Sequence, residues 1–404
     1  MKAFWRNPVY VLFAATTIVL ITNGSRQTLG LFLVPMSESL GWDRSNFSDA
    51  IAFQNLVIGC CAPFVGAIAD RLGPIRVIAL AGLFYAVGIG LISAATTTTG
   101  IMLSGGLVAG LGAAGIGLTL PLALVGRVAP DASRTLWLGI VTAGASAGQF
   151  VFAPTSTGLI TAFGWSQGIL FVGVIIALTI PLALTMKAGS AETLARPDIQ
   201  SLGAALREAS GHRGYWLLVM GFFVCGFQVQ FIGTHFPGFL QDSGAGSWLA
   251  AWALGTIGFF NICGTILAGV LGARHSKKNL LSLLYLSRGL LFLVFIMLPV
   301  NTYTVIGFSA ILGVLWLSTV PLTSGIVAQV FGPRYMGTLF AIVFFSHQLG
   351  SFSGVYLGGY FYDLYGSYDA AWWLAIALGA VAALIHWAID DRPVARWAAE
   401  RKSG

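Results

Sequence analysis

The chain has 404 residues, of which 57% are hydrophobic and 9% are charged, and its formal net charge is +7. A soluble domain ordinarily carries about 25% charged residues. Because a chain this apolar would expose far more hydrophobic surface than water tolerates, the composition excludes an ordinary soluble protein and favours one that faces lipid.

Apolar runs long enough to cross a bilayer recur along the whole chain. A helix needs about 20 apolar residues to cross a hydrocarbon core of about 30 Å. Twelve runs meet this requirement and are numbered spans 1 to 12 in chain order: 8–36, 45–69, 75–95, 100–127, 135–162, 166–186, 214–240, 247–272, 279–299, 302–330, 335–362 and 368–389. Turn-forming or charged clusters such as Asp70-Arg71-Leu72-Gly73 separate them. The sequence therefore predicts an all-α membrane protein with twelve transmembrane helices.

The one long polar stretch of the sequence, 188–213, lies between spans 6 and 7. It divides the spans into two sets of six. The predicted domains are an N-terminal six-helix half at 1–187, a cytoplasmic linker at 188–213, a C-terminal six-helix half at 214–389 and a cytoplasmic tail at 390–404.

Basic residues set the predicted orientation. With the N-terminus in the cytoplasm, all but three of the 21 Lys and Arg residues fall in cytoplasmic segments. Arg44 falls outside, and Arg26 and Arg288 fall within spans. An excess of basic residues on the cytoplasmic side is the rule for helical membrane proteins, so topology explains the net charge and no nucleic-acid partner is expected. We expect a monomeric multi-pass protein of the plasma membrane, in a bacterium the inner membrane, with both termini cytoplasmic.

Short motifs recur in the two halves at a nearly constant offset. Thr119-Leu120-Pro121-Leu122 in span 4 recurs as Thr319-Val320-Pro321-Leu322 in span 10, 200 residues later. Cys60, Gly66 and Arg71 each recur as the same residue type 203 positions later. Two parallel repeats related by an axis along the membrane normal are the layout of a carrier whose site lies between its halves.

The segment Gly66-Ala67-Ile68-Ala69-Asp70-Arg71-Leu72-Gly73-Pro74-Ile75-Arg76, between spans 2 and 3, resembles the signature loop of the major facilitator superfamily. The resemblance covers the whole chain, including a second copy in which Ala273 replaces Asp70 and Ser276 replaces Gly73. It implies the major facilitator fold of two pseudo-symmetric six-helix halves that work by alternating access. It also implies that spans 1, 4, 7 and 10 line the cavity and that spans 3, 6, 9 and 12 lie at the periphery.

Asp70, Arg71, Arg76 and Arg134 form the predicted latch of this carrier. Asp70 would lie at the cytoplasmic N-terminus of span 11, near 333–337, where the helix dipole stabilises a carboxylate by about 0.3–1 kcal/mol. The three arginines are its expected ionic neighbours, and their contacts would hold the outward-facing state. The alternative is a loop that only sets the topology.

Arg26 is the main candidate for binding a substrate. All 14 acidic residues lie in loops or at span ends, whereas Arg26 lies within Asn23-Gly24-Ser25-Arg26-Gln27 of span 1. An arginine at a helix centre costs about 2.5–3.5 kcal/mol, so it is expected to face a cavity or a partner. Its planar guanidinium matches a carboxylate bidentately, which makes a small anionic substrate the predicted counter-ion. The alternative is a structural arginine that caps backbone carbonyls where Gly24 and Gly30 loosen the helix.

Arg288 and His347 are two further candidates within spans. For Arg288 in span 9, a binding role and a structural role are both open. His347 lies midway along span 11 and is a candidate for proton coupling because histidine titrates near neutral pH, with a packing histidine as the alternative. The remaining predicted binding residues are polar or aromatic and lie at cavity depth: Asn23, Gln27, Gln54, Asn55, Thr119, Gln149, Gln230, Asn261, Trp316 and Thr319.

Span 1 ends in Gly30-Leu31-Phe32-Leu33-Val34-Pro35-Met36, followed by Gly41-Trp42. This pattern is similar to the monocarboxylate porter and oxalate/formate exchanger branch of the superfamily. The resemblance implies that a cation in span 1 serves the substrate carboxylate, and Arg26 falls close to that position. Span 8 departs from the branch, because Asn261 and Thr265 stand where animal carriers have an Asp and an Arg. The proton relay of the branch is therefore not implied.

These observations favour a secondary active transporter of small organic anions such as monocarboxylates, coupled to protons or working as an exchanger. Two alternatives stay open. One is an efflux carrier for neutral or amphipathic compounds, in which Arg26 is structural, and the other is a transport-inactive membrane sensor. Because the sequence has no metal-ligand cluster, nucleotide-binding loop or nucleophile elbow, we expect neither an enzyme nor a metal or cofactor.

Overall fold

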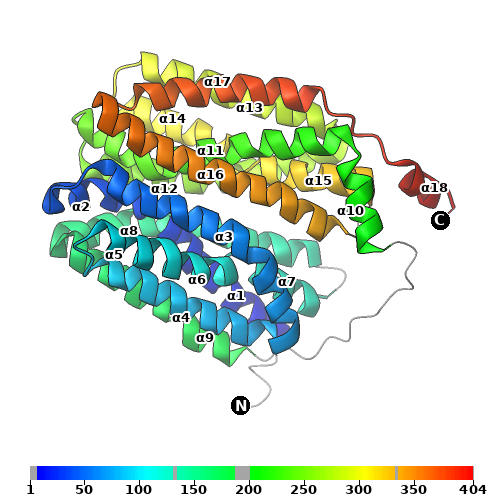
Figure 1. The fold of residues 1–404 in the computed structure, drawn as a ribbon, viewed down its shortest axis with the longest axis horizontal. Coiled ribbons are helices and arrows are strands. Elements are labelled where there is room, and N and C mark those ends of the chain that lie inside the picture. The colour runs from blue at the N-terminus through cyan, green and yellow to red at the C-terminus, as the bar shows by residue number, and fades with distance from the viewer. Residues whose placement is uncertain (1–6, 131–133, 187–200, 333–334, 404) are drawn as a thin grey trace.

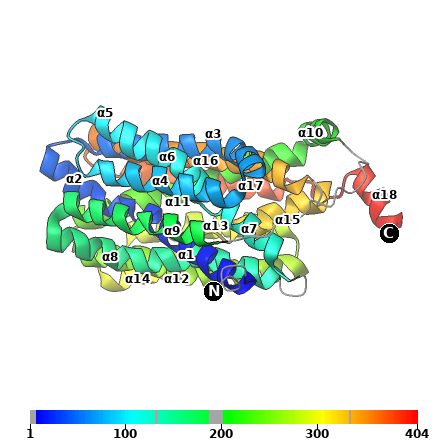
Figure 2. The same ribbon diagram turned by 90° about the horizontal axis from the view of Figure 1, so that it is seen from below.

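The computed structural model describes residues 7–130, 134–186, 201–332 and 335–403, apart from the side chains of residues 70, 134, 135 and 400–403. The helices run side by side along one common direction (Figures 1 and 2). The first half contains α1 (Pro8–Gln27), η2 (Leu29–Phe32), α2 (Leu33–Leu40), α3 (Arg44–Leu72), α4 (Pro74–Ile92), α5 (Thr98–Ile101), η3 (Met102–Val108), α6 (Ala109–Ile116), α7 (Thr119–Val128), α8 (Arg134–Ala177) and α9 (Thr179–Thr185). The rest of the chain contains α10 (Leu202–Ser210), α11 (Arg213–Asp242), α12 (Ser247–Arg274), α13 (Lys277–Met297), α14 (Thr302–Leu315), α15 (Thr319–Phe331), α16 (Met336–Tyr365), α17 (Asp369–Trp387) and α18 (Ala395–Ser403).

Eleven of the described segments are long and apolar enough to cross a membrane, and one of them holds two spans. This segment, Leu136–Thr185, has 50 residues, which would be about 75 Å long as one helix. The chain folds back at Gly164, whose φ of 78° lies in the left-handed region that glycine tolerates. A Cβ on Gly168 would lie 3.3 Å from the nitrogen of Ile160, so the two arms of α8 pack against each other. The predicted twelve-span helical fold is confirmed.

Spans 4 and 10 are both interrupted before the repeated motif. Span 4 stops at Ile116 and restarts as α7 at Thr119, and span 10 stops at Leu315 and restarts as α15 at Thr319. The proline of each motif is therefore the third residue of a new helix. At that position its missing N–H breaks no intrahelical hydrogen bond. The repeated sequence thus encodes a helix restart in each half.

Each half has its own hydrophobic core. In the second half, Trp372 of α17 is 1% exposed and lies at the centre of an aromatic cluster. Its ring centroid is 5.4 Å from that of Phe292 and 5.8 Å from that of Phe295. Large apolar side chains on the outside of the bundle are exposed, as expected where a helix faces lipid.

The bundle has two ends with different turns. The Arg44 end comprises the turns at 41–43, 93–97, 243–246, 298–301 and 366–368. The Lys277 end comprises Gly73, the turn at 275–276, and the helices α10 and α18, which both views place beyond one end of the bundle (Figures 1 and 2).

Toward the Arg44 end, helices from the two halves approach closely. Helices α3 and α16 run side by side (Figure 1), and a Cβ on Gly359 of α16 would lie 2.8 Å from the side chain of Ser48 in α3. A Cβ on Gly30 of η2 would lie 2.3 Å from the carbonyl oxygen of Gly233 in α11. Small residues permit this backbone approach, as they do between membrane helices generally.

Replacing Gly164 tests the fold-back between spans 5 and 6. Gly164→Ala puts a side chain at φ 78° and ψ 167°, so we expect a loss of about 1–3 kcal/mol and a lower Tm of the purified protein. Gly139→Ala is the control, because a Cβ there would meet no described atom within 4 Å and alanine favours a helix. Equal Tm values for Gly164→Ala and the wild type would contradict this account.

Candidate functional site

Two adjoining cavities lie between the halves, with volumes of about 170 and 240 Å³. Together they are called the central cavity. They share five lining residues: Asn23, Gln27, Leu118, Leu317 and Val320. The first cavity is lined by parts of α1, α3, α4, α6, α7, α11, α15 and α16, and the second by parts of α1, α8, α12 and α15.

Eight predicted binding residues line the central cavity, and they come from both halves: Asn23, Arg26, Gln27, Thr119, Gln149, Gln230, Asn261 and His347. None of the lining residues that the structure describes is an Asp or a Glu. Arg26 therefore supplies the fixed charge of the cavity.

Arg26 reaches the first cavity from the last turn of α1. Its Nη2 donates a hydrogen bond to Oδ1 of Asn55 in α3, and its Nε is buried with no partner among the described atoms. A guanidinium has five N–H donors. Since Asn55 is the one acceptor that the described chain provides, most of these donors remain available to a ligand.

Asn55 joins the two halves behind Arg26. The same Oδ1 accepts a hydrogen bond from Nε2 of Gln230 in α11 at 3.1 Å. The backbone oxygen of Asn55 accepts a hydrogen bond from Nε2 of Gln348 in α16 at 3.3 Å. Asn55 is fully buried, so one neutral side-chain oxygen holds the first-half guanidinium and a second-half amide together.

The second cavity contains a further link between the halves. Nδ2 of Asn261 in α12 donates to Oγ of Ser146 in α8 at 2.9 Å, and Oδ1 of Asn261 accepts from the nitrogen of Leu317 at 3.0 Å. Within the described chain, Nε2 of Gln149 and Oε1 of Gln27 are buried without partners. The cavity thus presents an amide donor and an amide acceptor beside the guanidinium.

Gln54, Trp316 and Thr319 lie behind the lining. Nε2 of Gln54 donates to the carbonyl oxygen of Gly105 at 2.7 Å, inside the π-helical segment η3. Thr319 is buried, with its Oγ1 3.2 Å from Sγ of Cys225. Trp316 is fully buried at the C-terminus of α14. These three side chains pack within the halves and do not face the cavity.

Arg288 is buried against the break in span 10. Its Nη2 donates to the carbonyl oxygens of Leu315 at 2.6 Å and Trp316 at 2.7 Å, and its Nη1 donates to Oε1 of Gln228 at 3.2 Å. The carbonyls at the end of a helix lack intrahelical partners. The geometry therefore matches the structural alternative, in which Arg288 caps α14.

Tyr85 of α4 also lines the cavity, which the sequence does not predict because span 3 is expected at the periphery. A Cβ on Gly112 of α6 would lie 2.2 Å from the nitrogen of Tyr85, so the backbone of α4 packs directly on α6 at this residue. The Tyr85 hydroxyl lies 3.5 Å from Oγ of Ser25. At the offset of 203 between the halves, Tyr85 corresponds to Arg288, a charged residue within a span, and this correspondence could have marked Tyr85 as a candidate.

Other cavity-lining residues that the sequence analysis did not predict are Thr22, Ser146, Thr265 and Gln348.

Toward the Lys277 end, four glycines of the described helices have open space beside them. Gly66 of α3, Gly139 of α8, Gly269 of α12 and Gly337 of α16 each continue a helical stripe that lines the central cavity. A Cβ on any of these four glycines would meet no described atom within 4 Å. At these four positions of the described chain the helices leave open space, whereas the halves are in contact at the Arg44 end.

Arg44 of α3 binds second-half side chains at the closed end. It donates to Oδ1 of Asp242 at 2.6 Å and to the Tyr368 hydroxyl at 2.8 Å, and its Cζ lies 4.0 Å from the ring centroid of Tyr362. Burial raises the pKa of the Tyr368 phenol, and Arg44 opposes that rise. The phenol therefore stays neutral and accepts the hydrogen bond from Arg44.

Asp363 of α16 adds a second link at this end. Its carboxylate accepts hydrogen bonds from the backbone nitrogens of Arg44 at 3.0 Å and Ser45 at 2.9 Å. These nitrogens belong to the first turn of α3, whose own N-cap residue, Asp43, makes no side-chain cap. A second-half carboxylate therefore caps a first-half helix, where the helix dipole also favours it. Arg44, Asp242, Tyr362, Asp363 and Tyr368 are called the Arg44 cluster.

The family profile of the Major Facilitator Superfamily matches residues 15–355. The chain belongs to this superfamily. Its relatives include the uncharacterized MFS-type transporter YcxA of Bacillus subtilis (strain 168), which is 25% identical over 386 residues covering 90% of each chain. Monocarboxylate transporter 12 of Rattus norvegicus is 24% identical over 393 residues, covering 88% of this chain and 80% of that one. Monocarboxylate transporter 13 of the same organism is 26% identical over 331 residues, covering 78% and 73%.

Two solved structures share the fold of this major facilitator. A bacterial homolog of the human lysosomal transporter Spinster, in an inward-facing and unoccupied conformation, has a TM-score of 0.75 and 15% identity over 94% of this chain and 96% of that one. A variant of the nucleoside transporter NupG has a TM-score of 0.77 and 13% identity over 95% and 99% of the two chains. The resemblance inferred from the signature loop is thus confirmed, and the chain is a multi-pass membrane transporter.

The latch predicted from the superfamily's signature loop lies at the Lys277 end. The side chains of Asp70 and Arg134 fall outside the described residues, while Arg71 and Arg76 are exposed. The latch therefore stays a prediction.

Removing the charge of Arg44 should open the closed end of this major facilitator. In a background where Ser replaces the four native cysteines, we expect Arg44→Gln to increase severalfold the labelling of Asn23→Cys by an impermeant maleimide added at the Arg44 end. The reason is that Asp242 loses its ionic partner and the α3 contact weakens. Arg392→Gln is the control, since that side chain is 89% exposed beyond α17 at the other end. Equal labelling with and without Arg44→Gln would refute this role.

Proposed function

We propose that the chain is a secondary active transporter of small organic anions such as monocarboxylates, working by alternating access. One observation carries the proposal: Arg26 lines a cavity between the halves that has no acidic residue in its described lining. A charge at this depth needs a counter-ion or a set of neutral acceptors, and Arg26 has a single neutral acceptor in the described chain. A carboxylate matches the guanidinium in shape and charge. The relatives named monocarboxylate transporters 12 and 13 support the same substrate class at low identity.

We further propose that the Arg44 end faces the outside of a plasma membrane, the inner membrane in a bacterium, and that both termini are cytoplasmic. The excess of Lys and Arg at the Lys277 end supports this orientation. In this orientation, the contacts of the Arg44 cluster close the outer end, and the open space beside Gly66, Gly139, Gly269 and Gly337 lies at the cytoplasmic end. This arrangement supports an inward-facing state of the carrier. The Spinster homolog of the same fold is also inward-facing.

In the proposed site, a substrate carboxylate replaces Oδ1 of Asn55 as the acceptor for Arg26. Two parallel hydrogen bonds to a planar fork are stronger than one bond to an amide oxygen. Because Asn55 also accepts from Gln230, binding would change a contact that joins the two halves. Gln27 and Gln149 would supply polar contacts to the rest of the ligand.

His347 is the group proposed for proton coupling, and anion exchange is the other mode. His347 lines the first cavity, and its Nδ1 lies 3.2 Å from Oε1 of Gln348. Nε2 of Gln348 in turn donates to the backbone of Asn55. A change of charge at His347 would therefore reach Asn55, the partner of Arg26, through two contacts.

A carrier for neutral or amphipathic compounds is the second candidate function. The apolar part of the cavity favours it, since Ile58, Leu118, Leu317, Val320 and Phe344 contribute to the lining. In that case Arg26 would be held by Asn55 alone and would not contact the ligand.

Arg26→Ala separates these two functions. We expect uptake of a radiolabelled monocarboxylate into proteoliposomes to fall about 10- to 100-fold, because one or more charged hydrogen bonds of about 1.5–3 kcal/mol are lost. Arg26→Lys should give an intermediate rate, since it keeps the charge but not the fork. Arg392→Gln should transport at the wild-type rate. Undiminished uptake by folded Arg26→Ala would rule out the anion site.

Asn55→Asp tests whether Asn55 occupies the place of a substrate carboxylate. The new side chain would pair with Arg26 permanently, so we expect carboxylate binding to weaken tenfold or more, read as a loss of ligand-induced thermal stabilisation. Asn55→Ala removes the same acceptor without adding charge and should retain carboxylate binding. Stabilisation of Asn55→Asp by carboxylates as strong as that of the wild type would refute the placement.

A further inference from the structure

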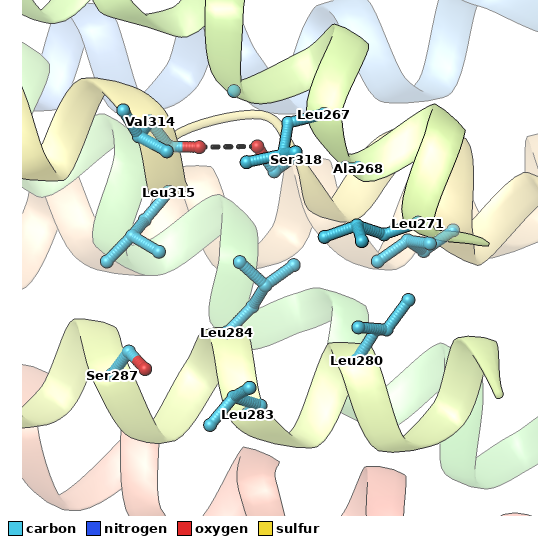
Figure 3. Close-up of a pocket in the computed structure, with 12 residues that line it drawn as sticks. Leu267, Ala268, Leu271, Leu280, Leu283, Leu284, Ser287, Val314, Leu315 and Ser318 are labelled. Carbon is cyan, nitrogen blue, oxygen red and sulfur yellow. Dashed lines mark hydrogen bonds between the residues drawn. The ribbon is translucent and has the colours of Figure 1, made fainter. Parts of the chain in front are cut away.

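A separate groove opens on the outer side of the second half, between α12 and α13. Its volume is about 150 Å³, and its floor is the break between α14 and α15. Figure 3 shows Leu280 and Leu284 of α13 pointing toward Leu271 of α12, with Val314 and Leu315 beside them. The lining is apolar except for Ser287 and Ser318.

The α12–α13 groove faces lipid. Two of its lining residues, Leu267 and Leu283, are 50% and 60% exposed, and the adjacent Ile266 is 64% exposed. In a chain that spans the membrane, such side chains contact acyl chains. Apolar space beside them would forfeit dispersion contacts if it stayed empty, so an acyl chain is the natural occupant.

Two basic residues continue the walls of the groove at the Lys277 end. On α12 the lining positions are 264, 267, 268 and 271, and the next position of that helical stripe is Arg274. On α13 the lining positions are 280, 283, 284 and 287, and the preceding position of that stripe is Lys277. Lys278 lies off the stripe and donates to the carbonyl oxygen of Ile389 at 2.7 Å.

The charge at this end of the groove is positive. The turn between α12 and α13 is the second copy of the signature loop, and Ala273 stands where the first copy has Asp70. Arg274 is exposed, and Nζ of Lys277 donates to a neutral acceptor, Oε1 of Gln329, at 2.9 Å. The carboxylate of Asp391 contacts Gln329 in turn, with its Oδ2 3.4 Å from Nε2 of Gln329. Among the described residues, neither Arg274 nor Lys277 forms an ion pair.

We propose that the groove, Arg274 and Lys277 form a binding site for an anionic phospholipid. An acyl chain lies in the groove, and the phosphate contacts the two basic side chains at the membrane surface. Long basic side chains place their apolar stems along the protein and their charge at the interface, where anionic headgroups lie. The site is independent of the substrate proposed for the central cavity.

The position of the groove links this lipid to the transport route. Leu315 and Ser318 form part of its floor, whereas Leu317 and Val320 of the same interrupted span line the central cavity. The bound acyl chain therefore contacts span 10 from behind, at the point where the helix is broken.

The headgroup is tested by native mass spectrometry of the full chain in detergent, titrated with phosphatidylglycerol or phosphatidylcholine of identical acyl chains. We expect the first phosphatidylglycerol to bind severalfold more tightly than the first phosphatidylcholine. The double variant Arg274→Gln, Lys277→Gln should lose roughly fivefold in phosphatidylglycerol affinity for each charge removed. Lys278→Gln, the matched control, should bind as the wild type does. Equal affinity for the two lipids, or an unchanged double variant, would overturn the proposal.

The acyl-chain contact is tested by filling the groove. Leu284→Trp should abolish the tight phosphatidylglycerol site, while Leu286→Trp, on the same helix but outside the lining and 45% exposed, should leave it intact. Ser287→Phe serves as a second groove-filling variant if Leu284→Trp has a lowered Tm. Glycerol phosphate without acyl chains should not bind. Unchanged lipid binding in a folded groove-filled variant, or tight binding of glycerol phosphate, would overturn the site.

Discussion

The cost of placing a positive charge among membrane-spanning helices organises this molecule. Arg44, at the end of the bundle where α3 begins, is paired with a carboxylate, Asp242, of the other half. Arg288 meets that cost with the backbone carbonyls that a broken helix leaves unpaired. Arg26 has one neutral oxygen, from Asn55, and otherwise faces a cavity. The first two arginines are satisfied by the protein and hold it together, and the third is the one that a ligand would complete.

The interruption of span 10 has several structural consequences. It leaves carbonyls that Arg288 caps, it places Leu317 and Val320 toward the central cavity, and it forms the floor of the α12–α13 groove. A continuous helix would satisfy its own carbonyls and would leave none at this point for Arg288 to cap. The matching interruption of span 4 shows that the helix restart belongs to the repeated unit and not to one half.

The two ends of the bundle differ in what joins the halves. At the Arg44 end, an ion pair, a helix cap from Asp363 and close glycine contacts act together. Each contact is modest alone, but all of them require the same relative position of the halves, so they are made or lost as a set. Opening this end would break all of these contacts together. Closing the other end would bring toward one another the helix faces that contain Gly66, Gly139, Gly269 and Gly337.

The sequence by itself determined the twelve spans, the superfamily, the repeated motif of spans 4 and 10 and the depth of Arg26, because hydropathy, charge placement and short motifs are local properties. It also identified eight cavity-lining residues from polarity and depth. Only the tertiary structure decided which face each helix turns to its neighbours. Depth along a span does not set its rotation, so Trp316 and Gln54 lie behind the lining while Tyr85 reaches it from a span expected outside. The Arg44 cluster was equally out of reach, since Arg44 lies about 200 to 320 residues from its partners in the chain and no local pattern joins them.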